Sequence, residues 1–281
     1  METRELRYFV AVAEELHFGR AADRLGIAQP PLSRAISQLE RRMGVTLLER
    51  DSRSVTMTPA GEALLHEGRA ALDAMEAAEH RARRAAVEIA APRLVISTKA
   101  GASSELLAKL LNAYAAEPGS VHVDVTLCPP GEQGRPIRTG RADVAILHKP
   151  FDDTTGLDTE ELLTEGQVVV LPAGHPLTAK DELRLADLDG LTDLPMPRWP
   201  APDGSYADGP GPEVQSHSQL LQLIALGRTL MVAPDSCRAQ LGEGLVARPL
   251  ADAPAVTTVI AWPPASRSRA VADLVRTATR L

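Results

Sequence analysis

The residues best suited to a specific chemistry lie in the segment AQPPLSRAISQLERRMG, residues 28–44. Two adjacent prolines, Pro30 and Pro31, mark the start of a helix, because proline lacks the N–H group that interior turns need. Beside them, the amide of Gln29 has the shape that pairs with adenine, and the guanidinium of Arg34 has the shape that pairs with guanine. A helix that carries such side chains near its N-terminus is suited to reading base edges in the major groove of DNA.

Apolar spacing shows which elements would hold this helix in place. Residues 4–16 predict an amphipathic helix, and residues 19–25 predict a shorter one with Gly19 as its N-cap. Within residues 28–44 the predicted buried stripe consists of Leu32, Ile36, Leu39 and Met43. Two short helices joined by a tight turn, the second with a polar outer face, are typical of a helix-turn-helix. β-favouring residues on both sides of a polar tip at 49–54 predict a two-stranded wing after it.

A long helix is predicted to follow the wing. Thr58 and Pro59 form a start signal, an N-cap followed by proline at the first helical position. Positions three and four apart carry small or apolar residues, namely Leu64, Gly68, Ala71, Met75, Ala78, Ala82, Ala85 and Ile89. This heptad spacing favours a dimerisation helix over a solvated connector.

Beyond Pro92 the chain alternates between strand-like and helix-like segments. Apolar β-rich runs such as 93–98, 121–127, 142–148, 167–174, 229–236 and 256–262 are separated by helical patterns, and residues 194–212 form a loop rich in proline and glycine. Such alternation indicates α/β units with a mostly parallel sheet. The helical head and this body are therefore expected to be separate domains.

Charge is distributed unevenly along the 281 residues, whose formal net charge is −7. Residues 20–58 carry seven arginines and four acids, whereas residues from 91 onward carry 17 basic and 23 acidic side chains. The mildly basic head keeps a nucleic-acid partner open although the whole chain is acidic. No apolar run approaches the ~20 residues of a membrane span, and the N-terminus lacks the pattern of a secretory signal. We expect a cytoplasmic protein with no membrane partner.

The stretch that contains LRYFVAVAEELHFGRAADRLGIAQPPLSRAISQLERR and TMTPAGE closely resembles the DNA-binding domain of LysR-type transcriptional regulators, and the match covers residues 4 to 62. The body is similar to the effector domain of the same family through GRADVAIL, VVVLPAGHPL, LADLDGL and LQLIALGRTLMVAPDS. The resemblance implies a winged helix-turn-helix at 1–58, a linker helix at 59–90 and an α/β effector domain at 91–281. That domain would resemble type 2 periplasmic binding proteins, with lobe I at about 93–163 and 266–281 and lobe II at about 164–265.

The family resemblance also implies partners. Promoter DNA would bind the head, a small-molecule effector would bind between the lobes, and the chain would form a homodimer or homotetramer. RNA polymerase is a further partner that the resemblance allows. The residues assigned to DNA are Gln29, Pro30, Pro31, Ser33, Arg34, Ser37 and, in the wing, Arg53. Ser33 and Ser37 suit phosphate contacts, and Arg53 would reach the minor groove or the backbone.

The effector site is expected around the stretch STKAGASSELL and the ends of other strands. Helix N-termini with nearby hydroxyl groups are suited to holding a ligand anion in such a cleft. Where regulators of aromatic catabolism often carry a serine, a threonine and an arginine, this chain has Gly101, Pro130 and His148. The residues predicted to contact effector are Thr98, Lys99, Gly101, Ser103, Pro130, His148, Arg198 and Thr229. Trp199 is a further candidate contact beside Arg198.

Two other function classes are weighed against this one. A thiol redox sensor would use Cys128 or Cys237, but the two lie far apart in the sequence. An enzyme on the same scaffold would need a catalytic motif, and the chain has no GxSxG, HExxH, Walker A or GxGxxG followed by a helix. A solute receptor on that scaffold would be expected to carry a secretory signal. We therefore expect a regulator with no catalytic residues, no metal site and no cofactor besides its effector.

Overall fold

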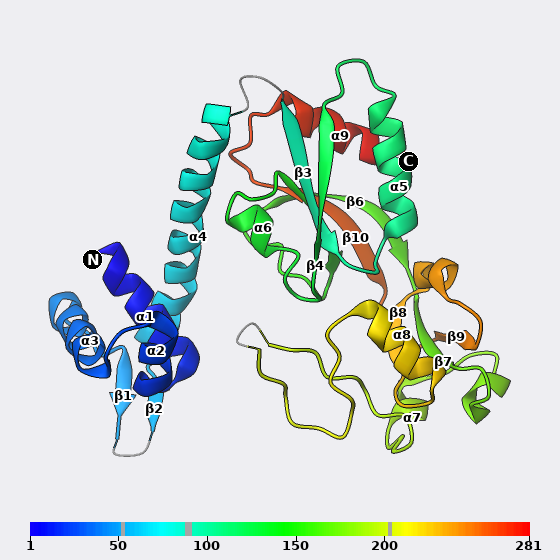
Figure 1. Ribbon diagram of the computed structural model, residues 1–281, viewed down its shortest axis with the longest axis horizontal. Coiled ribbons are helices and arrows are strands. Elements are labelled where there is room, and N and C mark those ends of the chain that lie inside the picture. The colour runs from blue at the N-terminus through cyan, green and yellow to red at the C-terminus, as the bar shows by residue number, and fades with distance from the viewer. Residues whose placement is uncertain (52–53, 88–91, 202–203) are drawn as a thin grey trace. The chain divides into compact units, whose positions relative to one another are not determined.

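The computed structural model describes residues 1–51, 54–87, 92–201 and 204–281, which divide into two units (Figure 1). The first unit comprises Met1–Ala85 with Arg138–Gly140, and the second comprises Ala86–Ile137 with Arg141–Leu281. Each unit has its own hydrophobic core.

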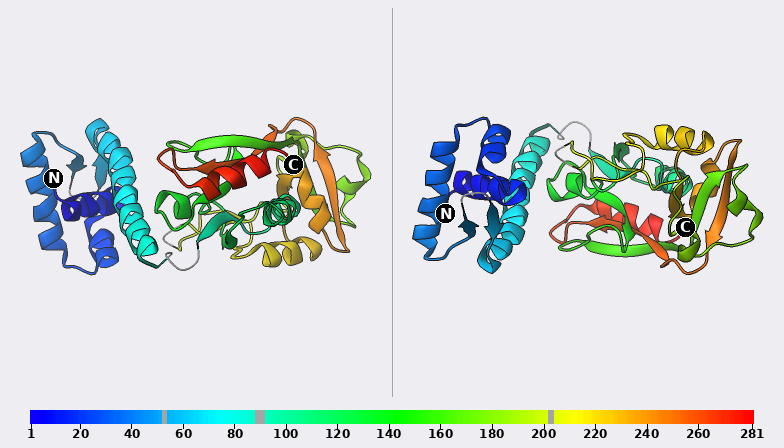
Figure 2. Two further views of the ribbon diagram at one scale, coloured as in Figure 1. Left: turned by 90° about the horizontal axis from the view of Figure 1, so that it is seen from above. Right: turned by 90° about the horizontal axis from the view of Figure 1, so that it is seen from below.

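The first unit is a helical head followed by a wing and a long helix. Its elements are α1 (Thr3–Glu15), α2 (Phe18–Leu25), α3 (Gln29–Met43), β1 (Leu48–Arg50), β2 (Val55–Met57) and α4 (Pro59–Val87). Within this unit α1 lies between α3 and α4 (Figures 1 and 2). Fully buried Phe9, Leu32, Ile36, Leu39 and Leu47 form the centre of its core. The predicted helix-turn-helix and wing are confirmed.

The prolines of α3 occupy its first turn, as predicted. Ala28 is the N-cap residue and provides no side-chain hydrogen bond to the free N–H groups. The helix ends at Gly44, whose positive φ of 72° closes the last turn. Met43, predicted as the end of the buried stripe, is instead 42% exposed, because it lies in this last turn beyond the core.

The first half of α4 is part of the head. The hydroxyl of Thr58 accepts a hydrogen bond from the N–H of Gly61 at 3.1 Å, which caps the helix. A Cβ on Gly61 would lie 2.2 Å from the carbonyl oxygen of Leu47, so only glycine allows this approach to the wing. A Cβ on Gly68 would lie 2.8 Å from the side chain of Leu6 on α1. Further along the predicted seam, the exposed residues are Ala71, Met75, Ala78 and Ala82.

The first lobe of the second unit is a five-stranded sheet in the order β4-β3-β5-β10-β6. Its elements are β3 (Arg93–Lys99), α5 (Ser104–Ala115), β4 (His122–Cys128), α6 (Arg135–Arg138), β5 (Val144–Lys149), β6 (Asp158–Glu165), β10 (Val256–Trp262) and α9 (Arg269–Ala278). Alternate residues of β5 face opposite sides: Ile146 packs with α5 and α9, and Leu147 packs with Ile137 of α6.

The second lobe is a three-stranded sheet in the order β8-β7-β9. Its elements are β7 (Gln167–Pro172), the 3-10 helix η1 (Pro176–Ala179), α7 (Leu185–Leu188), α8 (His217–Ala225), β8 (Met231–Pro234), the 3-10 helix η2 (Asp235–Gln240) and β9 (Leu245–Leu250). Val168 and Val170 of β7 pack against α8, whereas Val169 and Leu171 pack on the other face with Leu183.

Two sequence-based expectations for these sheets are wrong. The sheets are not mostly parallel, because β10 pairs antiparallel with β5 and β6, and β7 pairs antiparallel with β8 and β9. Residues 256–262 also belong to the first lobe's sheet and not to lobe II, which was expected to reach residue 265. The short connection 251–255 carries the chain from β9 in the second lobe back to the first lobe, where β10 begins at Val256 opposite Glu165, the last residue of β6, and so runs antiparallel to β6.

The lobes are joined by two chain segments that lie side by side. One leads from β6 into β7 and the other from β9 into β10, where Val256 pairs with Glu165. Hydrogen bonds connect the two segments: the hydroxyls of Thr164 and Thr257 are 2.9 Å apart, and the amide of Gln167 donates to the carbonyl of Pro254 at 2.9 Å. They form a double connection between the lobes.

Candidate functional site

The outer face of α3 carries the residues predicted to contact DNA. Gln29, Pro30, Pro31 and Arg34 are exposed, whereas Ser33 and Ser37 are half-buried. Among the described residues, the side chain of Arg34 has no hydrogen-bond or ion-pair partner in the chain. Its guanidinium, with five donors, is therefore available to an external acceptor.

Arg50 of the wing strand β1 contacts residues of α2 and α3. The guanidinium of Arg50 lies 4.6 Å from the ring centre of Phe18, donates to the hydroxyl of Ser33 at 3.3 Å and pairs with Glu40 at 3.1 Å. The hydroxyl of half-buried Ser33 therefore already has a hydrogen-bond partner within the head. Arg53, the predicted wing contact, lies outside the described residues.

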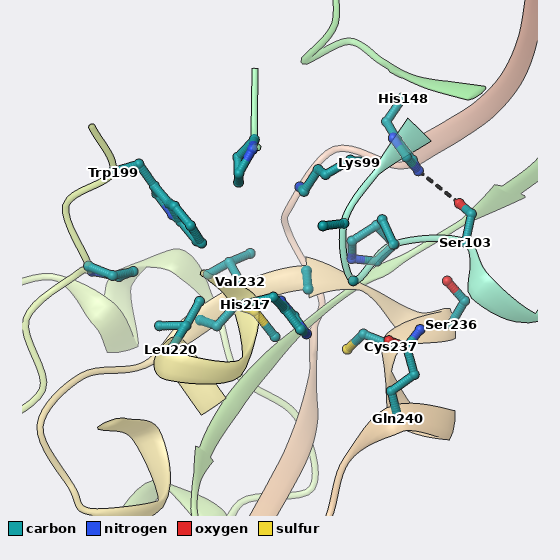
Figure 3. Close-up of a pocket in the computed structure, with 18 of the residues that line it drawn as sticks. Lys99, Ser103, His148, Trp199, His217, Leu220, Val232, Ser236, Cys237 and Gln240 are labelled. Atoms are coloured by element: carbon teal, nitrogen blue, oxygen red, sulfur yellow. Dashed lines mark hydrogen bonds between the residues drawn. The ribbon is translucent and has the colours of Figure 1, made fainter. Parts of the chain in front are cut away.

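A cavity of about 160 Å³ lies between the two lobes of the second unit (Figure 3). The first lobe contributes the loop after β3 together with Pro130 and His148, and the second lobe contributes the start of α8, strand β8 and the 3-10 helix η2. The lining residues used below are Lys99, Gly101, Ser103, His148, Trp199, His217, Leu220, Met231 and Val232. The geometry is that of a small-molecule site: concave, mostly apolar and with a few polar groups.

Lys99 is the cation of this cavity. Its ammonium makes no hydrogen bond or ion pair within the described part of the chain, and burial lowers its pKa, although the charge of Asp152 opposes that shift. Asp152 is itself engaged, because it accepts the amide of Gln133 at 2.5 Å and the backbone N–H of His148 at 2.7 Å. The positive charge of Lys99 is therefore only weakly compensated by the protein.

His148 connects the cavity to Asp152. Its Nε2 lies 2.9 Å from the hydroxyl of Ser103, and its Nδ1 lies 3.5 Å from a carboxylate oxygen of Asp152 without forming a hydrogen bond. Burial raises the pKa of Asp152, but its contacts with His148 and Gln133 outweigh burial, so the pKa is lowered overall. The imidazole of His148, 6% exposed, is fixed between Ser103 and a carboxylate.

Gly101 and His217 bring the two lobes together at the cavity. Gly101 has a φ of 78°, and a Cβ added there would lie 2.4 Å from Cγ of His217. His217 is the first residue of α8, where Ser216 is the N-cap. Burial lowers the pKa of His217, and the charge of Lys99 lowers it further. Figure 3 shows Lys99, Trp199 and His217 bordering the same space.

The structure places five of the eight predicted effector contacts at the cavity, namely Lys99, Gly101, Ser103, Pro130 and His148. Three others do not line it. Thr98 is buried within the first lobe, and Thr229 is buried with its hydroxyl donating to the carbonyl of Pro195 at 2.6 Å. Arg198 instead organises its own loop through the carbonyls of Gly211 and Ala207 and the carboxylate of Glu213.

Several cavity residues were not among the predicted contacts. These are His217, Met231, Ser236 and Gln240 from the second lobe, whereas Trp199, named with Arg198 from the sequence, does line the cavity. One signal was present in the sequence: Ser216 and His217 open an amphipathic helix, a place where polar groups face a cleft.

Both cysteines are free and buried. Burial raises the pKa of Cys128, and burial raises the pKa of Cys237, a cavity residue, to about 11. Neither thiol is activated as a thiolate at neutral pH, and thiolate is the form that reacts with peroxide.

Two further features concern the described residues only. They contain no group of three or more His, Cys, Asp or Glu side chains that could hold a metal ion. None of their helices is long and apolar enough to cross a membrane.

Comparisons with known proteins agree with this geometry. The family model of the bacterial regulatory helix-turn-helix protein, lysR family, matches residues 3–62, and the model of the LysR substrate binding domain matches residues 90–281. The chain is 32% identical over 293 residues to the Hca operon transcriptional activator HcaR of Escherichia coli, covering 98% of this chain and 96% of HcaR.

Two other proteins are similar to this chain. The transcriptional regulator AlsR of Bacillus subtilis is 38% identical over 206 residues, which cover 71% of this chain and 66% of AlsR. The structure of Corynebacterium glutamicum OxyR in its oxidized form matches with a TM-score of 0.53 at 26% identity, covering 99% of this chain and 90% of that one. The chain belongs to the LysR family of DNA-binding transcription regulators with an effector-binding domain, and not to a family of enzymes.

Proposed function

We propose that α3 reads promoter DNA through Gln29 and Arg34 and that a small molecule in the cavity between the lobes sets the activity of this regulator. The observation that carries the DNA part is the exposed Arg34, which has no partner among the described residues and lies one turn after the prolines. The exposed prolines keep the first turn slim enough to approach a base pair, and Ser37 is placed for a phosphate contact.

The same proposal includes self-association through α4. Ala71, Met75, Ala78 and Ala82 are exposed at heptad spacing, and a second copy of this helix would bury them. A homodimer presents two α3 helices to two half-sites of DNA, and pairing of dimers gives a homotetramer.

The cellular setting follows from the same role. A regulator of promoters acts in the cytoplasm, where RNA polymerase is an additional partner. The effector is the only small molecule in the proposal, with no resident cofactor.

The DNA assignment is tested with Arg34→Ala. The probe is a duplex that the wild-type full-length protein enriches from a random-sequence library, compared with a scrambled duplex of the same composition. Loss of a bidentate arginine contact costs about 1–3 kcal/mol, so gel retardation should weaken by roughly 5-fold to 150-fold on the enriched duplex and little on the scrambled one. Arg280→Ala, which removes an exposed arginine from the second unit, is the matched control and should leave retardation unchanged. Unchanged specific binding by folded Arg34→Ala protein would overturn the assignment.

A further inference from the structure

We propose that the effector is a compact organic monoanion, a single carboxylate on an apolar body about the size of one ring, anchored by Lys99. This inference rests on the proposed effector role of the cavity. It specifies the chemical class of molecule that the cavity accepts.

The sign of the charge follows from the lining. The described residues that line the cavity include Lys99, His148 and His217 but no aspartate or glutamate. Asp152, the acidic side chain that acts on Lys99, is engaged by Gln133 and by the N–H of His148. A desolvated ammonium without an ion-pair partner favours an anionic ligand, because the ligand supplies the missing charge.

The N-terminus of α5, which borders the cavity at Ser103, also favours an anion. Ser103 is the N-cap residue of the twelve-residue helix α5, but its side chain does not cap the helix and instead contacts Nε2 of His148. The first-turn N–H groups of α5 thus receive no side-chain acceptor from the N-cap residue. Their partial positive charge adds to that of Lys99 on the side of the cavity formed by residues 99–103.

The remaining walls define the body of the ligand. Trp199, Leu220, Met231 and Val232 present apolar surface, and Figure 3 shows Trp199 and Leu220 across the space from Ser103. Ser236 and Gln240 of η2 are uncharged polar side chains of the second lobe's wall. A second carboxylate against the apolar part of this wall would lose its hydration without gaining a partner. The volume of about 160 Å³ is close to the ~150 Å³ cavity that holds one benzene molecule. Nucleotides are larger than this space.

The experiment is a calorimetric titration of the full-length protein with three probes of nearly equal shape: benzoate, benzamide and benzylamine. Isovalerate and isovaleramide repeat the comparison with an aliphatic body. We expect each carboxylate to bind at least about tenfold more tightly than its amide, since hydrogen bonds to charged groups contribute about 1.5–3 kcal/mol. The amine should bind most weakly.

The anchor is tested with Lys99→Met, which keeps the length of the side chain and removes its charge. This variant should lose the preference for carboxylate over amide while keeping its circular dichroism spectrum and its retardation of DNA. Lys109→Met is the matched control, because Lys109 is exposed on α5 and pairs with Glu105 outside the cavity. It should bind the probes like the wild-type protein.

The possible outcomes separate this inference from the proposed function. Amide or amine binding as tight as carboxylate binding would overturn the anion inference and leave the cavity as the effector site. An unchanged carboxylate preference in Lys99→Met would overturn the anchoring role of Lys99. If no probe of any class binds at millimolar concentration, both the inference and the effector role of this cavity fail, while the DNA assignment stands on its own test.

Discussion

Gly101 is the residue on which the contact between the lobes depends most directly. Its positive φ of 78° favours glycine, and the space of a Cβ is already occupied by the ring of His217. The two restrictions are independent, since one concerns the local backbone and the other concerns a side chain from a distant part of the chain. They can be separated by experiment.

We predict that Gly101→Ala weakens both stability and probe binding. Gly119→Ala is the control, because Gly119 also has a positive φ, of 82°, but has no atom within 4 Å of an added Cβ. The control should cost about 1 kcal/mol of unfolding free energy from backbone strain. Gly101→Ala should cost about 1–3 kcal/mol more through overpacking, and should weaken benzoate binding because His217 is displaced. Urea unfolding and calorimetry measure the two effects, and equal losses in both variants would contradict the contact.

The pKa of His217 predicts a dependence of stability on pH. Burial and the charge of Lys99 lower this pKa below the ordinary value of 6.5, so the unfolded chain takes up a proton at a pH where the folded protein does not. The unfolding free energy should therefore fall as pH decreases below about 6.5 toward the folded-state pKa. His217→Gln should show a smaller loss between pH of about 7.5 and about 5.5, measured by urea unfolding. A wild-type loss no larger than that of the variant would contradict the lowered pKa.

At the scale of elements, the two helices that serve DNA binding are built differently. α3 has a weak N-cap, Ala28, so its first-turn N–H groups remain available to an acceptor such as a DNA phosphate. α4 is firmly capped by Thr58 and packs on the head through Gly61 and Gly68. The first-turn N–H groups of α3 are free of a side-chain cap, whereas the N-terminus of α4 is capped and packed against the head.

The exposed seam of α4 predicts the effect of a charge on self-association. Ala78→Glu places a carboxylate within the seam, where two helices in contact would have to bury it. Ala70→Glu places the same exposed charge on another face of α4. We expect sedimentation to show a shift toward monomer for Ala78→Glu and no shift for Ala70→Glu. Equal behaviour of the two variants would exclude this face as the dimer contact.

The sequence predicts elements well where apolar periodicity and start signals agree. The extent of α3 and the start of α4 follow from proline and threonine positions. The start of α2 does not: the N-cap is His17, whose Nδ1 accepts the N–H groups of Gly19 and Arg20, because a histidine ring can replace the usual capping oxygen. β6 (DTEELLTE) is mostly polar and β9 (LVARPL) is interrupted by arginine and proline, so neither has a clear strand pattern.

At the scale of the whole molecule, the distribution of charge differs between the DNA-binding head and the effector-binding body. Residues 1–85 contain thirteen arginines and thirteen acids, so the net charge of −7 comes from the rest of the chain. An acidic body repels phosphate and leaves the outer face of α3 as the favoured surface for DNA. An organic monoanion, by contrast, reaches a local cation inside a cavity whose described lining contains no acidic residue.

The cavity shows why a site is harder to predict than a fold. Lys99, Gly101 and Ser103 belong to one continuous stretch, which was predicted to contact the effector and lines the cavity in the structure. Trp199, His217 and Met231 come together with it only because the chain crosses between the lobes twice, and the antiparallel return through β10 was not predicted. Thr98 has a suitable side chain but is buried within β3, and Thr229, which precedes β8, is buried with its hydroxyl donating to the carbonyl of Pro195.

The double connection between the lobes has a mechanical consequence. The two segments are hydrogen-bonded to each other, Thr164 with Thr257 and Gln167 with Pro254. We expect such a pair to resist stretching and sliding more strongly than bending. We therefore expect any change in the arrangement of the lobes to take place as a bend at these two segments. A small ligand that contacts both lobes of the cavity would then act on the second unit by fixing the angle between the lobes.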